Sequence, residues 1–226
     1  MNENPTIYFY HIRKTGGTSI NFAFFSASGK DPQLVYNELN KHKSIRCDKY
    51  KFVRDVIDEL NNGSYFYGFS HIPSHNLNLA QHIIKITCFR DPIKRVLSIY
   101  RAMMWKKSVG EPRPGHIWLG SSFSDFLNKL PRTRLCEQLY MFSSTYNVDE
   151  ALETTSKCKY ILFTDNINNG MNKISHDLGI KLKIKHDNKS IYEFEPTDED
   201  FDKLSNMLID EIKFVDILRS KYAREG

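Results

Sequence analysis

The sequence predicts an α/β fold, a three-layer α/β/α arrangement in which helices cover both faces of a central, mostly parallel sheet. Runs of β-branched and aromatic residues alternate along the chain with segments whose apolar residues recur at helical spacing. This alternation is typical of a parallel sheet that is buried on both faces. The chain has 226 residues, of which 40% are hydrophobic, so we expect one domain with a sizeable core over residues 1–226.

The first part of the chain opens with a strand at 6–11, where β-branched and aromatic residues run together, and a helix follows at 18–27 after a glycine turn. Residues 30–50 have a mixed polar pattern and are assigned to no element. Apolar residues at helical spacing predict a helix at 51–60, which an Asn-Asn-Gly run would end. An aromatic run predicts the second strand at 64–69.

The rest of the chain repeats the alternation. An apolar run predicts a buried strand at 82–89, and Pro92 suits the first turn of a helix that continues to about residue 106. Three glycines and two prolines predict a long loop at 107–122, and long loops in compact domains often bind ligands. The remaining patterns predict a short helix from 124, helices at 132–142 and 148–156, a fourth strand at 159–164, a helix at 168–178, a polar loop at 186–196 and a last helix at 197–218.

Composition narrows the class of function. The net charge of +5 is modest and scattered, which suits an anionic substrate and argues against a nucleic-acid partner. The four cysteines form no CxxC pair, so we expect reduced, mostly buried thiols and no metal. The chain contains no signal peptide and no apolar run of roughly 20 residues, so we expect a cytoplasmic protein without an integral membrane segment. The oligomeric state stays open.

The first motif is Lys14-Thr15-Gly16-Gly17-Thr18-Ser19, which follows an apolar strand and precedes a helix. Main-chain N–H groups and the positive end of a helix dipole make such a turn an anion site. In the usual nucleotide-triphosphatase loop the lysine follows the second glycine, whereas Lys14 precedes both. The alternative is a plain strand–turn–helix joint with a helix-capping hydroxyl.

The second motif begins with Arg90-Asp91-Pro92 at the end of a predicted strand and includes Ser98 on the following helix. A guanidinium and a hydroxyl can hold one phosphate between them, and arginine matches phosphate oxygens in a bidentate manner. Taken alone, the same residues could form a basic amphipathic helix with a solvated face. We therefore interpret this motif together with the first.

Together the two motifs resemble the sulfotransferase superfamily that uses 3′-phosphoadenosine 5′-phosphosulfate. The string HIRKTGGTS at residues 11–19 is similar to the HIPKTGGTS form of carbohydrate sulfotransferases of the heparan-sulfate 2-O and 6-O type, with Arg13 in place of proline. The family pattern Arg-x-Pro-x-x-Arg-x-x-Ser-x-Tyr is met at Arg90, Pro92, Arg95, Ser98 and Tyr100. The resemblance implies a P-loop-like version of the α/β fold.

The resemblance also implies roles for individual residues. Lys14 would stabilise the leaving group, and His71, after the second strand, would be the catalytic base, with His75 as the alternative; a structural role for His71 stays open. Arg90 and Ser98 would hold the 3′-phosphate. The other residues expected at the donor are Thr15, Gly16, Gly17, Thr18, Ser19, Lys189 and Ser190. The product would be adenosine 3′,5′-bisphosphate, and the chemistry needs no metal.

The acceptor is the least determined partner. We expect a hydroxyl of a glycan or glycolipid to bind at the loop 107–122 and the preceding helix, where aromatic and basic residues gather: Arg101, Trp105, Arg113, His116 and Trp118. The two tryptophans could equally anchor the loop to the core. The alternatives are a small-molecule or secondary-metabolite alcohol as acceptor and, in other classes, a P-loop kinase or nucleotide-binding protein, or a non-catalytic binding protein.

Overall fold

The computed structural model describes residues 5–111, 114–182 and 192–222. Within these residues the strands form a six-stranded sheet in the order β2-β3-β4-β1-β5-β6. All neighbouring pairs are parallel except β2 and β3. The strands are β1 Ile7–Tyr10, β2 Ser44–Cys47, β3 Tyr50–Arg54, β4 Tyr67–Ser70, β5 Ile84–Phe89 and β6 Tyr160–Phe163. The predicted α/β fold with a mostly parallel central sheet is confirmed.

Strand β1 is central, and every residue in it is buried. Successive side chains of a strand point to opposite faces, so β1 contributes to two separate cores. Phe9 belongs to the cluster on one face of the sheet, and Tyr8 and Tyr10 belong to the cluster on the other. A continuous apolar run of this kind is typical of a strand covered on both sides.

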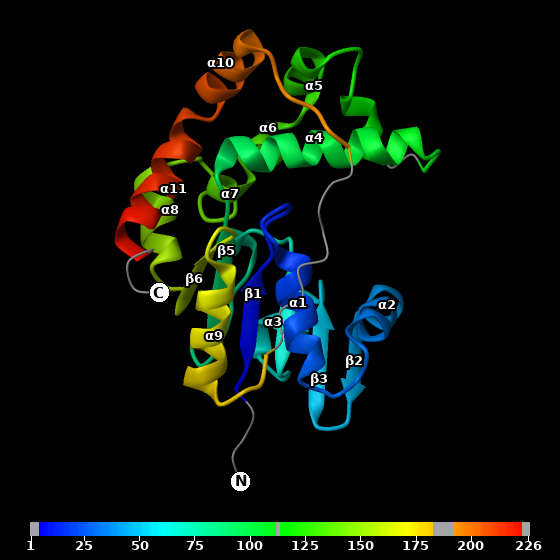
Figure 1. Ribbon diagram of the computed structural model, residues 1–226. Coiled ribbons are helices and arrows are strands. Elements are labelled where there is room, and N and C mark those ends of the chain that lie inside the picture. The colour runs from blue at the N-terminus through cyan, green and yellow to red at the C-terminus, as the bar shows by residue number, and fades with distance from the viewer. Residues whose placement is uncertain (1–4, 112–113, 183–191, 223–226) are drawn as a thin grey trace.

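Helices form a layer on each face of the sheet (Figure 1). One layer consists of α1 Gly17–Ser26, α2 Pro32–His42 and α9 Ile167–Leu178, whose apolar residues join the cluster that contains Phe9. The opposite layer consists of α3 Ile57–Asn62, α7 Glu137–Tyr140, α8 Val148–Thr155 and α11 Ile209–Tyr222. The three predicted layers are therefore present.

A third apolar cluster lies beyond the end of the sheet at which the parallel strands finish. The long helix α4 crosses this end, and Figure 1 shows α5 and α10 on its far side. The parts of this region, together with a short turn after β4, are η1 Ser74–Asn76, α4 Pro92–Ser108, η2 Pro114–Trp118, α5 Phe123–Lys129, α6 Arg132–Leu135 and α10 Asp198–Met207. Helices α4, α5 and α10 thus cover the end of the sheet at which the central strands finish.

The prediction of a helix at 51–60 is wrong. Residues 50–54 form β3, and a helix, α3, begins only at Ile57. Phe52 and Val53 are adjacent and both fully buried, but they pack in opposite clusters, as the residues of a strand do. The apolar spacing joined a buried strand to a short helix and so imitated one longer helix.

Other boundaries differ from the sequence-based expectations. The unassigned residues 30–50 form α2, which Asp31 caps by accepting from the Gln33 N–H, and the antiparallel strand β2. The segments predicted as single helices at 132–142 and 197–218 are each divided, at Cys136 and Leu208. The loop 107–122 contains η2.

Two expectations from composition can be compared with the structure. All four cysteines are buried free thiols, as expected. Among the described residues, no helix has the length and apolar character needed to cross a bilayer.

Candidate active site

Three neighbouring strands deliver the candidate residues to one edge of the sheet. Strand β1 lies between β4 and β5, and all three run in the same direction. His71 follows β4, the Lys14 turn follows β1, and Arg90 follows β5. Ligands of open parallel sheets bind outside the carboxyl ends of the strands. The segments that the sequence places after strands therefore lie side by side where a ligand is expected.

The turn after β1 brings two left-handed residues to the start of helix α1. Lys14 and Gly16 both have left-handed conformations, with φ of 67° and 78°. Helix α1 begins at Gly17, and among the described residues no side chain caps its start. The hydroxyl of Thr15 is buried and donates to the carbonyl of Ile12 at 2.9 Å, so this hydroxyl stabilises the turn from inside. Thr18 and Ser19 are partly exposed.

Gly17 allows a close contact between the start of α1 and a histidine. A Cβ atom at this position would lie 2.0 Å from Nε2 of His11. The ring of His11 packs between the helix and His71, with the two imidazole centroids 4.4 Å apart. Burial, and then the neighbouring His71 and Arg13, lower the pKa of His11 well below its usual value. His11 is therefore neutral at neutral pH.

His71 is held in one orientation by a main-chain atom. Its Nδ1 lies 2.5 Å from the carbonyl oxygen of His11. A carbonyl only accepts, so Nδ1 carries the proton and Nε2 carries the lone pair. Burial, and then Arg13, lower the pKa of His71 to about 4, although the His11 carbonyl and Glu137 oppose this shift. The alternative base, His75, is exposed and packs edge-on against Tyr140.

Arg90 is fixed at both its main chain and its side chain. Its N–H donates to Oε1 of Gln138 at 2.8 Å, and its Nη1 donates to the carbonyl of Lys14 at 3.2 Å. Among the described residues no carboxylate forms an ion pair with Arg90. Ser98 is buried on α4, 9% exposed. Arg90 therefore joins the end of β5 to the turn after β1.

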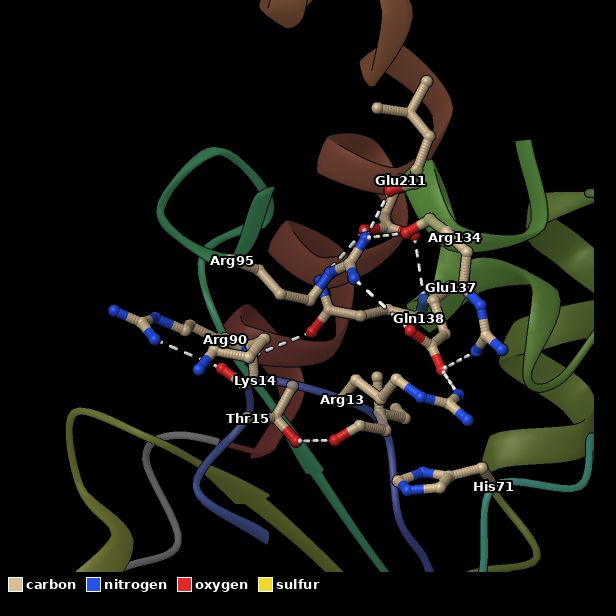
Figure 2. Close-up of polar contacts among 12 residues, drawn as sticks. Arg13, Lys14, Thr15, His71, Arg90, Arg95, Arg134, Glu137, Gln138 and Glu211 are labelled. Carbon is tan, nitrogen blue, oxygen red and sulfur yellow. Dashed lines mark hydrogen bonds and ion pairs between the residues drawn. The ribbon is translucent and has the colours of Figure 1, made fainter. Parts of the chain in front are cut away.

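A buried charge network lies behind these residues (Figure 2). Glu137 accepts from Arg13 at 2.5 Å and from Arg134 at 3.2 Å, and forms a longer ion pair of 3.7 Å with Arg95. Arg95 is fully buried and pairs with Glu211 on α11 at 3.2 Å. Burial raises the pKa of Glu211, although Arg95 opposes the shift. Arg95, although part of the second motif, thus belongs to the interior.

The sequence did not predict that Glu137, Gln138 and Glu211 lie beside the candidate site. Polar residues in a helical segment ordinarily indicate a solvated face, and nothing local distinguishes these three from exposed ones. Only their partners reveal them, since the Arg13–Glu137 pair joins residues 124 positions apart.

The amino-acid sequence was compared with models of known protein families. The model of the Sulfotransferase family matches residues 1–219. The chain belongs to the sulfotransferase family. A comparison with curated proteins finds no match. As a sulfotransferase, the protein is a transferase that moves a sulfuryl group to a hydroxyl-bearing acceptor.

The predicted acceptor residues of the sulfotransferase lie along α4 and η2. Trp105 stands about 20 Å along α4 from Pro92, at the rise of an α-helix. Trp118 packs on the third apolar cluster, so it anchors this segment, and His116 lies beside it in η2. Arg101 donates from two nitrogens to the carbonyl of Phe194, at 3.0 and 2.5 Å. Arg113, Lys189 and Ser190 lie outside the described residues.

Metal-binding groups can be assessed for the same part of the chain. Among the residues that the structure describes, no three His, Cys, Asp or Glu side chains gather in a way that could hold a metal ion.

Proposed function

We propose that this sulfotransferase transfers the sulfuryl group of 3′-phosphoadenosine 5′-phosphosulfate to an acceptor hydroxyl, with His71 as the base. The observation that carries the proposal is the hydrogen bond from Nδ1 of His71 to the His11 carbonyl, beside the Lys14 turn. This bond leaves Nε2 as the proton acceptor. The lowered pKa keeps the ring neutral at neutral pH, which leaves Nε2 unprotonated but makes it a weaker base than an ordinary imidazole.

The turn after β1 suits the 5′-phosphosulfate end of the donor. Among the described residues no side chain caps the start of α1, so main-chain N–H groups are available there, and Gly16, Gly17, Thr18 and Ser19 carry no bulky side chains. When bound, the donor supplies an activated sulfuryl group and an anionic leaving group. Lys14 would place its ammonium charge on the bridging oxygen as the bond to sulfur breaks.

The 3′-phosphate is assigned to Arg90 and Ser98. Arg90 has no ion-paired carboxylate among the described residues, and a partly buried guanidinium of this kind can pair with an anionic ligand. Its link to the Lys14 carbonyl would hold the sites for the two ends of the nucleotide in one geometry. Lys189 and Ser190 are proposed, from the family resemblance alone, to contact the same donor.

The acceptor is proposed to be a glycan or glycolipid, and a small-molecule alcohol is the alternative. Support for a sugar or lipid comes from the partly exposed Trp105 and Trp118 along α4 and η2 and from Ile117, which is 76% exposed. Aromatic faces pack well on sugar rings and on apolar rings. Arg101 and His116 lie in the same region, and Arg113 is included from the sequence alone.

Calorimetric binding of two nucleotides tests the donor. We expect adenosine 3′,5′-bisphosphate to bind more tightly than ATP with Mg²⁺, because Arg90 and Ser98 are assigned to a 3′-phosphate that ATP lacks. Tighter binding of ATP would overturn the proposal and support the kinase alternative. A screen of acceptors with sulfur-labelled donor then separates glycans and glycolipids from small alcohols, because only a true acceptor incorporates the label.

A further inference from the structure

Gln138 connects the candidate site to the interior of the molecule. It lies in α7 and has no exposed surface. Its side chain forms two hydrogen bonds in different directions: Oε1 accepts the N–H of Arg90 at 2.8 Å, and Nε2 donates to Oε1 of Glu211 at 3.2 Å. Gln138 is fully buried, so it does not touch a ligand itself, and its hydrogen bond toward the candidate site is the one to Arg90.

Glu211 determines which way the Gln138 amide faces. The carboxylate also accepts from Arg95 Nη2 at 3.2 Å, from the Gln138 N–H at 2.9 Å and from the Leu139 N–H at 3.1 Å. A carboxylate surrounded by donors must face the NH₂ group of the amide, since the opposite orientation would set two acceptors against each other. The amide oxygen is thereby directed at Arg90.

Arg90 is consequently held at two points (Figure 2). The Gln138 oxygen fixes its main chain at the end of β5, and the Lys14 carbonyl receives one arm of its guanidinium at 3.2 Å. Without Gln138, the N–H of Arg90 would lose its partner at the end of a buried strand. A buried donor without a partner is costly, so the strand end would shift to find another.

We propose that Gln138 is a positioning residue for recognition of the 3′-phosphate, holding the main chain of Arg90 while Glu211 sets the orientation of its amide. The inference rests on the proposed function, in which Arg90 binds that phosphate. The competing interpretation is that Gln138 only contributes to the stability of the buried network. The two interpretations differ in whether the loss of Gln138 affects one phosphate of the nucleotide selectively.

The test compares two nucleotides that differ by the 3′-phosphate. Binding of adenosine 3′,5′-bisphosphate and adenosine 5′-monophosphate is measured by calorimetry on the wild type and on Gln138→Met, which keeps the length of the side chain and removes the amide oxygen. We expect the bisphosphate to bind about three- to tenfold more weakly to the variant, the scale of one hydrogen bond. We expect the monophosphate to bind as it does to the wild type.

Gln33→Met is the matched control. Gln33 lies on the exposed side of α2, and its amide also donates a hydrogen bond, to Asn37 at 2.9 Å. This variant should leave the binding of both nucleotides unchanged. If Gln138→Met instead weakens both nucleotides equally, or lowers only the melting temperature, the role of Gln138 is structural and the inference is wrong.

The failure of the proposed function would be recognised separately. If the wild type binds both nucleotides equally, Arg90 does not bind a 3′-phosphate. Both the assignment of Arg90 to that phosphate and the inference about Gln138 are then wrong. If Gln138→Met does not fold, nuclear magnetic resonance of the wild type decides. The side-chain amide signals of Gln138 should shift when the bisphosphate is added but not when the monophosphate is added, and identical spectra in the two titrations would overturn the inference.

Discussion

The imidazole of His71 donates from Nδ1 to the main-chain carbonyl of His11 at 2.5 Å, and the two rings lie 4.4 Å apart. The pair joins the end of β4 to the end of β1, so that one strand fixes the tautomer of a histidine on its neighbour. Both pKa values are lowered, chiefly by burial, and that of His71 lies at about 4. Several measurable consequences follow from this arrangement and from the charge network beside it.

Replacing His71 should slow turnover strongly and leave donor binding intact. We expect His71→Gln to lower kcat by about 10²- to 10⁴-fold, the usual contribution of a general base. Binding of adenosine 3′,5′-bisphosphate, measured by calorimetry, should not change. His75→Gln is the control, since His75 is exposed and packs on Tyr140. A variant at His75 that is inactive while His71→Gln stays active would reverse the assignment of the base.

The lowered pKa of His71 predicts how stability depends on pH. Between the ordinary histidine value of about 6.5 and the folded value of about 4, the unfolded chain binds a proton that the folded chain does not. The free energy of unfolding should therefore fall as the pH falls through this window. Urea denaturation at pH 7 and pH 4.5 measures the change, which should be smaller in His71→Gln. An equal change in both proteins would show that His71 does not titrate in this way.

Lys14 should act on the transition state more than on the bound nucleotide. We expect Lys14→Ala to reduce kcat by about 10²- to 10³-fold, as for other electrostatic stabilisers, with a smaller effect on the affinity for adenosine 3′,5′-bisphosphate. Lys43→Ala is a matched control, because Lys43 is exposed and has a similar left-handed backbone, with φ of 64° against 67° for Lys14. Full activity of Lys14→Ala would remove the lysine from the mechanism.

Gly17 should tolerate no side chain while His11 keeps its place. A Cβ atom would overlap the His11 ring at 2.0 Å, so we expect Gly17→Ala to lower the free energy of unfolding by about 1–3 kcal/mol, the usual cost of overpacking. Thermal unfolding measures the change. In a background of His11→Ala the same substitution should cost much less. An equal cost in both backgrounds would show that the His11 ring is not what excludes a side chain at Gly17.

The Arg95–Glu211 pair should show strong coupling. Both side chains are fully buried, so Glu211→Leu leaves the buried guanidinium with only its longer ion pair of 3.7 Å to Glu137 and should cost about 3–5 kcal/mol. The double variant Arg95→Met with Glu211→Leu should cost clearly less than the two single changes added together. Urea denaturation of the four proteins completes the cycle. Simple additivity would mean that the pair contributes no mutual stabilisation.

The local patterns were the reliable part of the sequence-based prediction. The strand before the glycine turn, the helix after it and the strand before Arg90 all lie where the sequence indicated, because turn residues and apolar periodicity act over a few neighbours. Strand β3 was missed because local apolar spacing did not separate it from the short helix that follows. Phe52 and Val53 pack on opposite faces of the sheet, a fact that no local pattern contains.

By itself the sequence determined the α/β class, the two motifs and the resemblance to sulfotransferases, since these depend on residue types at short spacing. Only the tertiary structure decided the order of the strands, in which β1 lies between β4 and β5 and the Lys14 turn lies between His71 and Arg90. It also decided that Arg95 is interior and that Gln138 links the main chain of Arg90 to Glu211. Those assignments depend on contacts between residues far apart in the chain, and desolvation and charge pairing at such contacts arise only when the fold has closed around them.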